Sequence, residues 1–310
     1  MTVLEKDQPP KASKVPERVG IFRQLLGTIP PGMERNLTFV GIAIVLLFLI
    51  FAIFSPIIAP YNPNIISMDQ IADRFTSPLR TSVLGNRYIM GTDDIGQDVL
   101  SRVIYGARIA LLVAFVASLF SVLIGVPLGL LAGYRGGTFD RVTTMIMDSL
   151  YAFPGLVLAI AITAVLGPGA GNVAVAIGVI YIPIYYRVMR GQALEVREEL
   201  YVEAAKAIGA SESSILVRYV AINIVPSILA VVAFNMADAI LTEAGLSFLG
   251  LGVGPDVPDW GFDLQKSFYR WFPKYPWTFF FPGIMIVTLS IGLSLVGEGL
   301  SVILSPQIRK

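Results

Sequence analysis

The sequence predicts an all-α integral membrane protein whose chain crosses the bilayer six times. Composition is the first observation: 55% of the 310 residues are hydrophobic and 15% are charged, whereas a soluble domain carries about 25% charged residues. The second is that the few charges gather between long apolar runs, a pattern typical of helices that face lipid. The third is that there are six such runs, each long enough to cross the hydrocarbon core as a helix rising about 1.5 Å per residue.

The six apolar runs are separated by polar loops or turns that set their limits. They lie at residues 37–60, between Arg108 and Arg135, on either side of a turn within the stretch from Arg141 to Arg187, at about residues 219–241 and at about residues 277–304. The turn is inferred at residues 166–172, because the stretch is too long for one helix and reads Leu-Gly-Pro-Gly-Ala-Gly-Asn at that point. An even number of spans places both chain ends on one side of the membrane.

The distribution of basic residues predicts which side that is. Lys and Arg are more frequent in the segments that face inward when the N-terminus is inside, so both termini are predicted to be cytoplasmic. The chain then divides into a cytoplasmic tail at 1–36, the first span at 37–60, an extracytoplasmic segment at 61–106, a five-helix core at 107–305 with a polar inner loop at 191–217, and a cytoplasmic end at 306–310. The tail contains a short amphipathic stretch suited to the membrane interface, and an unstructured tail is the alternative.

The residue inventory excludes several kinds of chemistry within this chain. It has no Cys and no His, so disulfides, thiol catalysis and His-based acid–base or metal chemistry are excluded. A net charge of +1 gives no sign of nucleic-acid binding, and no phosphate-binding loop of the form G-x-x-x-x-G-K-[ST] is present. Asp93, Asp94 and Asp98 lack the ligand spacing of a standard calcium loop, so turn and helix-capping roles are predicted for them instead of a metal site.

Four acidic residues fall within or near the predicted spans: Asp148, Asp238, Glu243 and Glu298. Because a carboxylate is costly in lipid, each should face the interior of the bundle, water or a hydrogen-bond partner. They are candidates for a translocation pathway or a gate. The alternative is that they serve helix packing and local capping, since none of them is paired in the manner of a proton relay.

The polar loop between the fourth and fifth spans predicts a short amphipathic helix. Its apolar or small residues fall on one helical stripe, namely Val196, Leu200, Ala204, Ala207 and Ile208. Gly209 is placed to end the helix in a left-handed conformation, and Ser211 to cap the helix that follows. Small residues permit close approach of a partner, although the pattern alone favours an ordinary surface helix without one.

Several motifs in one order make the sequence similar to a known family. Glu203-Ala204-Ala205 followed by Gly209 resembles the EAA loop of binding-protein-dependent ABC importer permeases. The sequences at residues 90–102, 133–141, 152–154 and 243–252 resemble further motifs of the oligopeptide/dipeptide/nickel branch of that family. The resemblance runs from about residue 88 to the end of the chain, and the long first span resembles the C-type member of the branch's two permeases.

This resemblance implies a type I ABC importer permease fold in which the loop forms a coupling helix. The implied ATPase-coupling residues are Glu203, Ala204, Ala205, Gly209, Leu200 and Ile208, with Ala204 and Ala205 leaving room for the ATPase subunit. The implied partners are a second homologous permease, two ATP-binding subunits that carry the ATP and Mg, an extracytoplasmic substrate-binding protein and membrane lipid. The chain itself would be no enzyme and hold no cofactor. Peptides are the expected solutes, and relatives that carry oligosaccharides or nickel leave those alternatives open.

Two other classes of function compete with this one. A secondary or proton-coupled carrier would use the buried acids directly, but no internal repeat of broken helices is seen in the sequence. An intramembrane enzyme would need a nucleophile and a base, and no Ser or Asp pair stands out in those roles.

Overall fold

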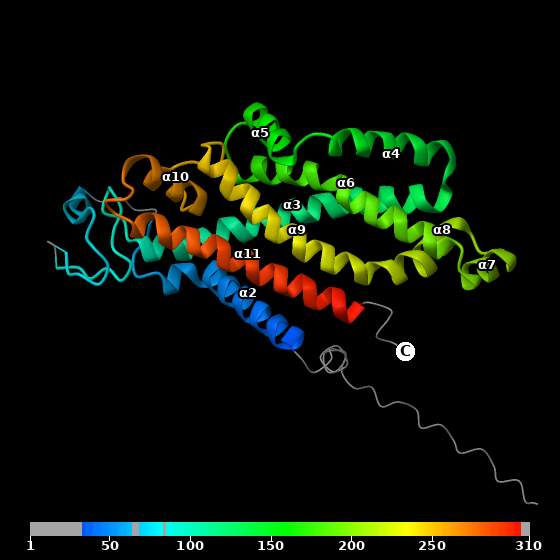
Figure 1. Ribbon diagram of the computed structural model, residues 1–310, viewed down its shortest axis with the longest axis horizontal. Helices are drawn as coiled ribbons and strands as arrows, with labels where there is room; N and C mark the ends of the chain where they lie inside the picture. The colour runs from blue at the N-terminus through cyan, green and yellow to red at the C-terminus, as the bar shows by residue number, and fades with distance from the viewer. Residues whose placement is uncertain (1–32, 64–67, 83–84, 305–310) are drawn as a thin grey trace, which may run out of the picture.

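A computed structural model describes residues 33–63, 68–82 and 85–304 of the protein. The amphipathic stretch predicted within the N-terminal tail and the C-terminal end at 306–310 lie outside the described residues. The described chain forms an elongated bundle of helices (Figure 1). This is the all-α membrane architecture that the apolar runs predict.

Five helices are long and apolar enough to cross a membrane. They are α2 (Met33–Ile58), α3 (Val99–Arg135), α6 (Ala170–Arg197), α9 (Ile222–Phe248) and α11 (Trp277–Leu304). Helix α3 begins earlier than the boundary predicted at residue 107, because the Asp98 carboxylate accepts a hydrogen bond from the Ser101 backbone amide at 2.8 Å and caps the helix. The spanning part of the chain therefore reaches into the predicted outer segment.

The third span is not one straight helix. Helices α4 (Gly137–Tyr151) and α5 (Gly155–Leu166) together are apolar enough to cross the membrane, but they meet at a bend of 88°. The turn predicted at residues 166–172 is present between α5 and α6, and the structure adds a second break at Ala152-Phe153-Pro154. Pro154 causes it, since proline has no backbone N–H and disfavours helical geometry in the residue before it. Counted as one span, this bent pair brings the number of candidate spans in the described residues to six.

Glycines allow α3 and α6 to pack with their backbones in contact. Gly125, Gly129 and Gly133 repeat every fourth residue along one face of α3. A Cβ at these positions would lie 2.5–2.9 Å from backbone oxygens and side chains of α6. Such close approach is typical of membrane helices, where small residues take the place of a hydrophobic driving force.

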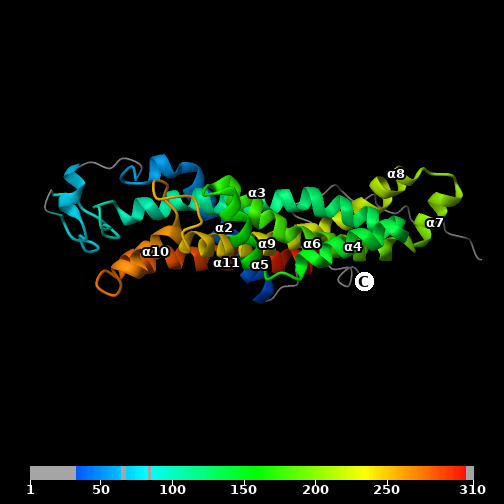
Figure 2. The ribbon, with the colours of Figure 1, turned by 90° about the horizontal axis from the view of Figure 1, so that it is seen from above.

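Different short helices lie at the two ends of the bundle. The start of α2 and the end of α11 lie toward the same end as two short helices, α7 (Leu200–Ala207) and α8 (Glu212–Ile215), which project beyond the spans (Figures 1 and 2). A π-helical segment at Leu216–Ala221 joins α8 to α9. At the opposite end lie α10 (Trp260–Arg270) and the 3-10 helix η1 (Met68–Asp73). We refer to these ends as the α7 end and the α10 end.

Candidate functional site

The predicted loop helix is present as α7, and the two residues predicted to end it and to cap the next helix, Gly209 and Ser211, have those roles. Gly209 has a φ of 80°, so it ends the helix in the left-handed conformation that glycine adopts without strain. The Ser211 hydroxyl accepts a hydrogen bond from the Ser214 backbone amide at 3.4 Å and caps α8. Both features were predicted from the sequence and are confirmed.

Helix α7 has one face buried against its own chain and one face exposed. Val202 and Ala205 are buried, with 0% and 3% of their surface accessible. Leu200 and Ile208 are 80% and 81% exposed, and Ala204 is exposed beside them. An exposed apolar patch of this kind commonly marks a contact with another molecule.

The structure corrects the predicted contact face in two respects. Ala205 does not lie with Ala204 on the exposed face but packs into the protein, because the two positions are 100° apart on a helix. Val196 belongs to α6, is partly buried, and is not part of α7. The predicted stripe assumed one continuous helix, whereas α6 ends at Arg197 and α7 starts at Leu200.

Polar contacts hold the α7–α8 segment against the end of α3. The Lys206 ammonium lies 5.6 Å from the centre of the Tyr134 ring. The Arg135 guanidinium pairs with Glu212 at 2.6 Å, and Arg197 donates to the Tyr134 carbonyl at 3.4 Å. Lys206 and Glu212 thus connect the α7–α8 segment to the end of α3, and Arg197 connects the end of α6 to it.

The four acidic residues predicted as pathway or gate candidates do not form one cluster among the described residues. Asp148 is exposed and pairs with the Arg187 guanidinium at 2.7 Å. Asp238 is exposed and accepts a hydrogen bond from the Tyr181 hydroxyl at 2.6 Å. Glu243 is 2% exposed, with the Ser247 hydroxyl 3.0 Å from its carboxylate, and Glu298 is exposed on α11. No hydrogen bond or ion pair joins two of the four within the described part of the chain.

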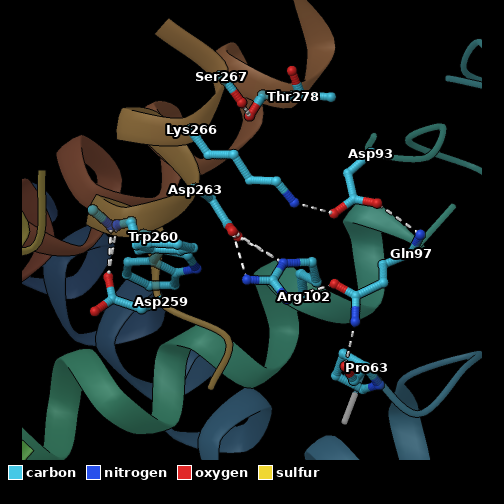
Figure 3. A network of polar contacts seen from close by, with 12 residues as sticks. Pro63, Asp93, Gln97, Arg102, Asp259, Trp260, Asp263, Lys266, Ser267 and Thr278 are labelled. Carbon is cyan, nitrogen blue, oxygen red and sulfur yellow. Dashed lines mark hydrogen bonds and ion pairs between the residues drawn. The ribbon is translucent and has the colours of Figure 1, made fainter. Parts of the chain in front are cut away.

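A buried ionic network at the α10 end was not predicted. The Arg102 guanidinium of α3 donates to the Asp263 carboxylate of α10 through Nε, at 3.0 and 3.1 Å to its two oxygens, and through Nη2 at 2.6 Å (Figure 3). It also donates to the Gln97 side chain at 2.8 Å, and Gln97 in turn donates to the Pro63 carbonyl. Arg102 and Asp263 are 161 residues apart, so no local spacing in the sequence signals the pair.

The acidic residues that precede α3 have the turn and capping roles predicted for them. The Asp93 carboxylate accepts hydrogen bonds from the backbone amides of Ile95 and Gln97, at 3.0 and 2.8 Å. Lys266 of α10 pairs with Asp93 at 3.2 Å (Figure 3) and also pairs with Asp94. Burial raises the pKa of Asp93 even though the Lys266 charge acts in the opposite direction. A cleft of about 550 Å³ lies beside this network, between the segment before α3 and α10.

Comparison with known sequences and structures identifies the family of the chain and a solved structure of the same fold. The model of the family "binding-protein-dependent transport system inner membrane component" matches residues 125–310. The model of the "N-terminal TM domain of oligopeptide transport permease C" matches residues 34–78. The inward-facing MetNI methionine ABC transporter has a chain of the same fold, with a TM-score of 0.54 and 19% identity over 64% of this chain and 93% of that chain.

Curated relatives are similar over nearly the whole chain. The dipeptide transport system permease protein DppC of Alkalihalophilus pseudofirmus is 35% identical, over 89% of this chain and 88% of its own. The glutathione transport system permease protein GsiD of Pectobacterium atrosepticum is 35% identical, over 86% and 85%. The di/tripeptide permease DppC of Pseudomonas aeruginosa is 34% identical, over 87% and 88%. The protein is therefore a multi-pass permease subunit of an ABC importer, a member of the binding-protein-dependent transport system inner membrane component family.

Proposed function

We propose that this permease forms half of the pathway of an ATP-driven importer for peptides or similar small solutes, and that α7 receives the movement of the ATPase subunits. The exposed apolar face of α7 carries the proposal. Leu200 and Ile208, each about four-fifths exposed, form with Ala204 a surface that is small in its middle and apolar at both ends, which suits a groove on a partner.

The α7 end is then the cytoplasmic end. ATP and Mg bind the two ATPase subunits, since the sequence of this chain has no phosphate-binding loop. Because one bundle encloses no pathway by itself, a second, homologous permease completes it. Peptide transport is the function named for several relatives, and an oligosaccharide is the alternative that the branch resemblance leaves open.

The α10 end faces the extracytoplasmic substrate-binding protein in this proposal. The described residues of the segments at 61–87 and 253–275 contribute to this end, and the many Pro, Gly and aromatic residues in these sequences suit a docking surface. The ion pair of Arg102 and Asp263 joins α10 to α3 at this end of the bundle.

Labelling of single cysteines tests the orientation, because the chain has no cysteine of its own. Ile89→Cys and Asp256→Cys, at exposed positions of the α10 end, should react with a membrane-impermeant maleimide in intact cells. Ile208→Cys should react only after the membrane is opened. Reaction of Ile208→Cys in intact cells, with Ile89→Cys protected, would invert the orientation and refute the proposed role of α7.

A further inference from the structure

Asp238 occupies an unusual position for a carboxylate in a membrane protein. It lies on α9, one of the helices able to span the membrane, well inside both helix ends. Phe234, Asp238 and Leu241 are all exposed, and their spacing of four and then three residues puts them on one face. A carboxylate facing lipid costs about 2.5 kcal/mol or more. This face of α9 therefore lies against water or another polar surface.

In the described part of the chain, the contacts of Asp238 are made by hydroxyl groups and not by a paired Lys or Arg. The Tyr181 hydroxyl of α6 donates to the carboxylate at 2.6 Å, and the Thr242 hydroxyl lies 3.4 Å from the Tyr181 oxygen. Within the described residues, no Lys or Arg is paired with Asp238, whereas both aspartates of α4 that face α6 are paired with arginines. The negative charge of Asp238 is thus not neutralised by a contact within this part of the chain.

The side chain that contacts Asp238, Tyr181, comes from the buried core of the bundle. Tyr181 is buried, 3% exposed, and belongs to the core that joins α6 to α9. The packing around Tyr181 therefore holds its ring in place. Its single hydroxyl hydrogen is donated to Asp238, and this hydrogen bond orients the carboxylate. The Thr242 hydroxyl then donates to the Tyr181 oxygen, so the other carboxylate oxygen and the Thr242 oxygen remain as hydrogen-bond acceptors.

We propose that Asp238, positioned by Tyr181, binds the side-chain ammonium group of a solute during its passage through the permease. A carboxylate beside two hydroxyl oxygens is rich in acceptors and suits a group with several N–H donors and a positive charge. It repels a carboxylate or phosphate at the same place. The inference rests on the proposed import function and adds a substrate class to it: solutes with an amino group near the point of contact, such as peptides that carry lysine.

The test compares two dipeptides in the complete transporter reconstituted in vesicles, with its binding protein at saturating concentration. Alanyl-lysine and alanyl-glutamate differ in the charge of one side chain. In Asp238→Asn, the ratio of uptake rates for alanyl-lysine over alanyl-glutamate should fall about fivefold relative to the unsubstituted protein, as expected for loss of one charge contact in a partly solvated site. Asp238→Glu should keep most of the preference. Glu195→Gln, an exposed carboxylate of α6 outside this cluster, is the matched control and should keep all of it.

Three outcomes overturn parts of this account, and they are distinguishable. An unchanged ratio in Asp238→Asn, with uptake still present, refutes the role of Asp238 and leaves peptide import intact. Failure of Asp238→Asn to assemble with the second permease, when Tyr181→Phe assembles, shows that the carboxylate pairs with the partner subunit and also refutes the inference. Uptake of neither dipeptide by the unsubstituted complex refutes peptide import, and the inference with it.

Discussion

Replacing Leu200 and Ile208 together with glutamate is expected to reduce ATP-driven uptake to about a tenth or less of the unsubstituted rate, because both side chains are proposed anchors of the ATPase contact. Each is about four-fifths exposed in this chain, so the substitutions remove no internal packing. Insertion into the membrane and thermal stability of the isolated permease should therefore stay unchanged. Co-purification of the ATPase subunits should decrease in parallel with uptake.

The matched control makes the same apolar-to-glutamate substitutions at the other end of the bundle. Leu79 and Ile89 are 64% and 52% exposed at the α10 end, and their replacement with glutamate should leave co-purification of the ATPase subunits unchanged. Normal co-purification and full uptake in the Leu200/Ile208 variant would contradict the assignment of α7 as the coupling helix.

The effect of Ala205→Glu has a different physical origin. Because Ala205 is 3% exposed and packs into the chain, a glutamate there buries a charge within the permease itself. Loss of function in that variant would report on folding and not on the ATPase contact. The exposed positions of α7 are the informative ones.

The second large effect is expected at the buried ion pair of the α10 end. Asp263→Asn removes the negative charge that is paired with Arg102, a residue that is only 5% exposed. Loss of one partner of a buried pair destabilises a protein by about 3–5 kcal/mol. The variant should show a large fall in the thermal unfolding midpoint of the detergent-solubilised protein.

An exposed ion pair of the same chain provides the comparison. Arg135 and Glu212 pair at 2.6 Å with about half of each side chain exposed, and pairs of this kind contribute about 0–1 kcal/mol. Glu212→Gln should therefore change the unfolding midpoint little. Replacing both Arg102 and Asp263 with Met and Leu should recover part of the stability lost in Asp263→Asn, since neither charge of the pair is then left buried without its partner. Equal shifts for Asp263→Asn and Glu212→Gln would contradict the structural role of the buried pair.

The local features of this permease were predictable because local residues determine them. Apolar runs give the spans, and the left-handed conformation of Gly209 follows from its place after a helix. Asp98 also carried a signal, since it is a good N-cap and marks the true start of α3. The bend at Pro154 follows from proline chemistry, although the longer turn at residues 166–172 was the stronger signal in that stretch.

Features that depend on contacts between distant segments were not predictable. The Arg102–Asp263 pair joins α3 to α10, and only the packing of those helices brings the two side chains together. The orientation of α7 depends on the break between Arg197 and Leu200, which resets the helical phase. The surroundings of Asp238 likewise come from α6, so the sequence identified a carboxylate in a span but not its Tyr181 partner.

A cross-link between α7 and an ATPase subunit is the most direct test of the central claim, that ATP hydrolysis acts on this permease through α7. Ile208→Cys introduces a single cysteine, since the chain has none. In the assembled and active transporter, a short bifunctional maleimide should join this cysteine to a cysteine-bearing ATPase subunit, in a yield that changes when ATP is bound. Absence of any cross-link from Ile208→Cys, in a complex that assembles and hydrolyses ATP normally, would contradict the claim.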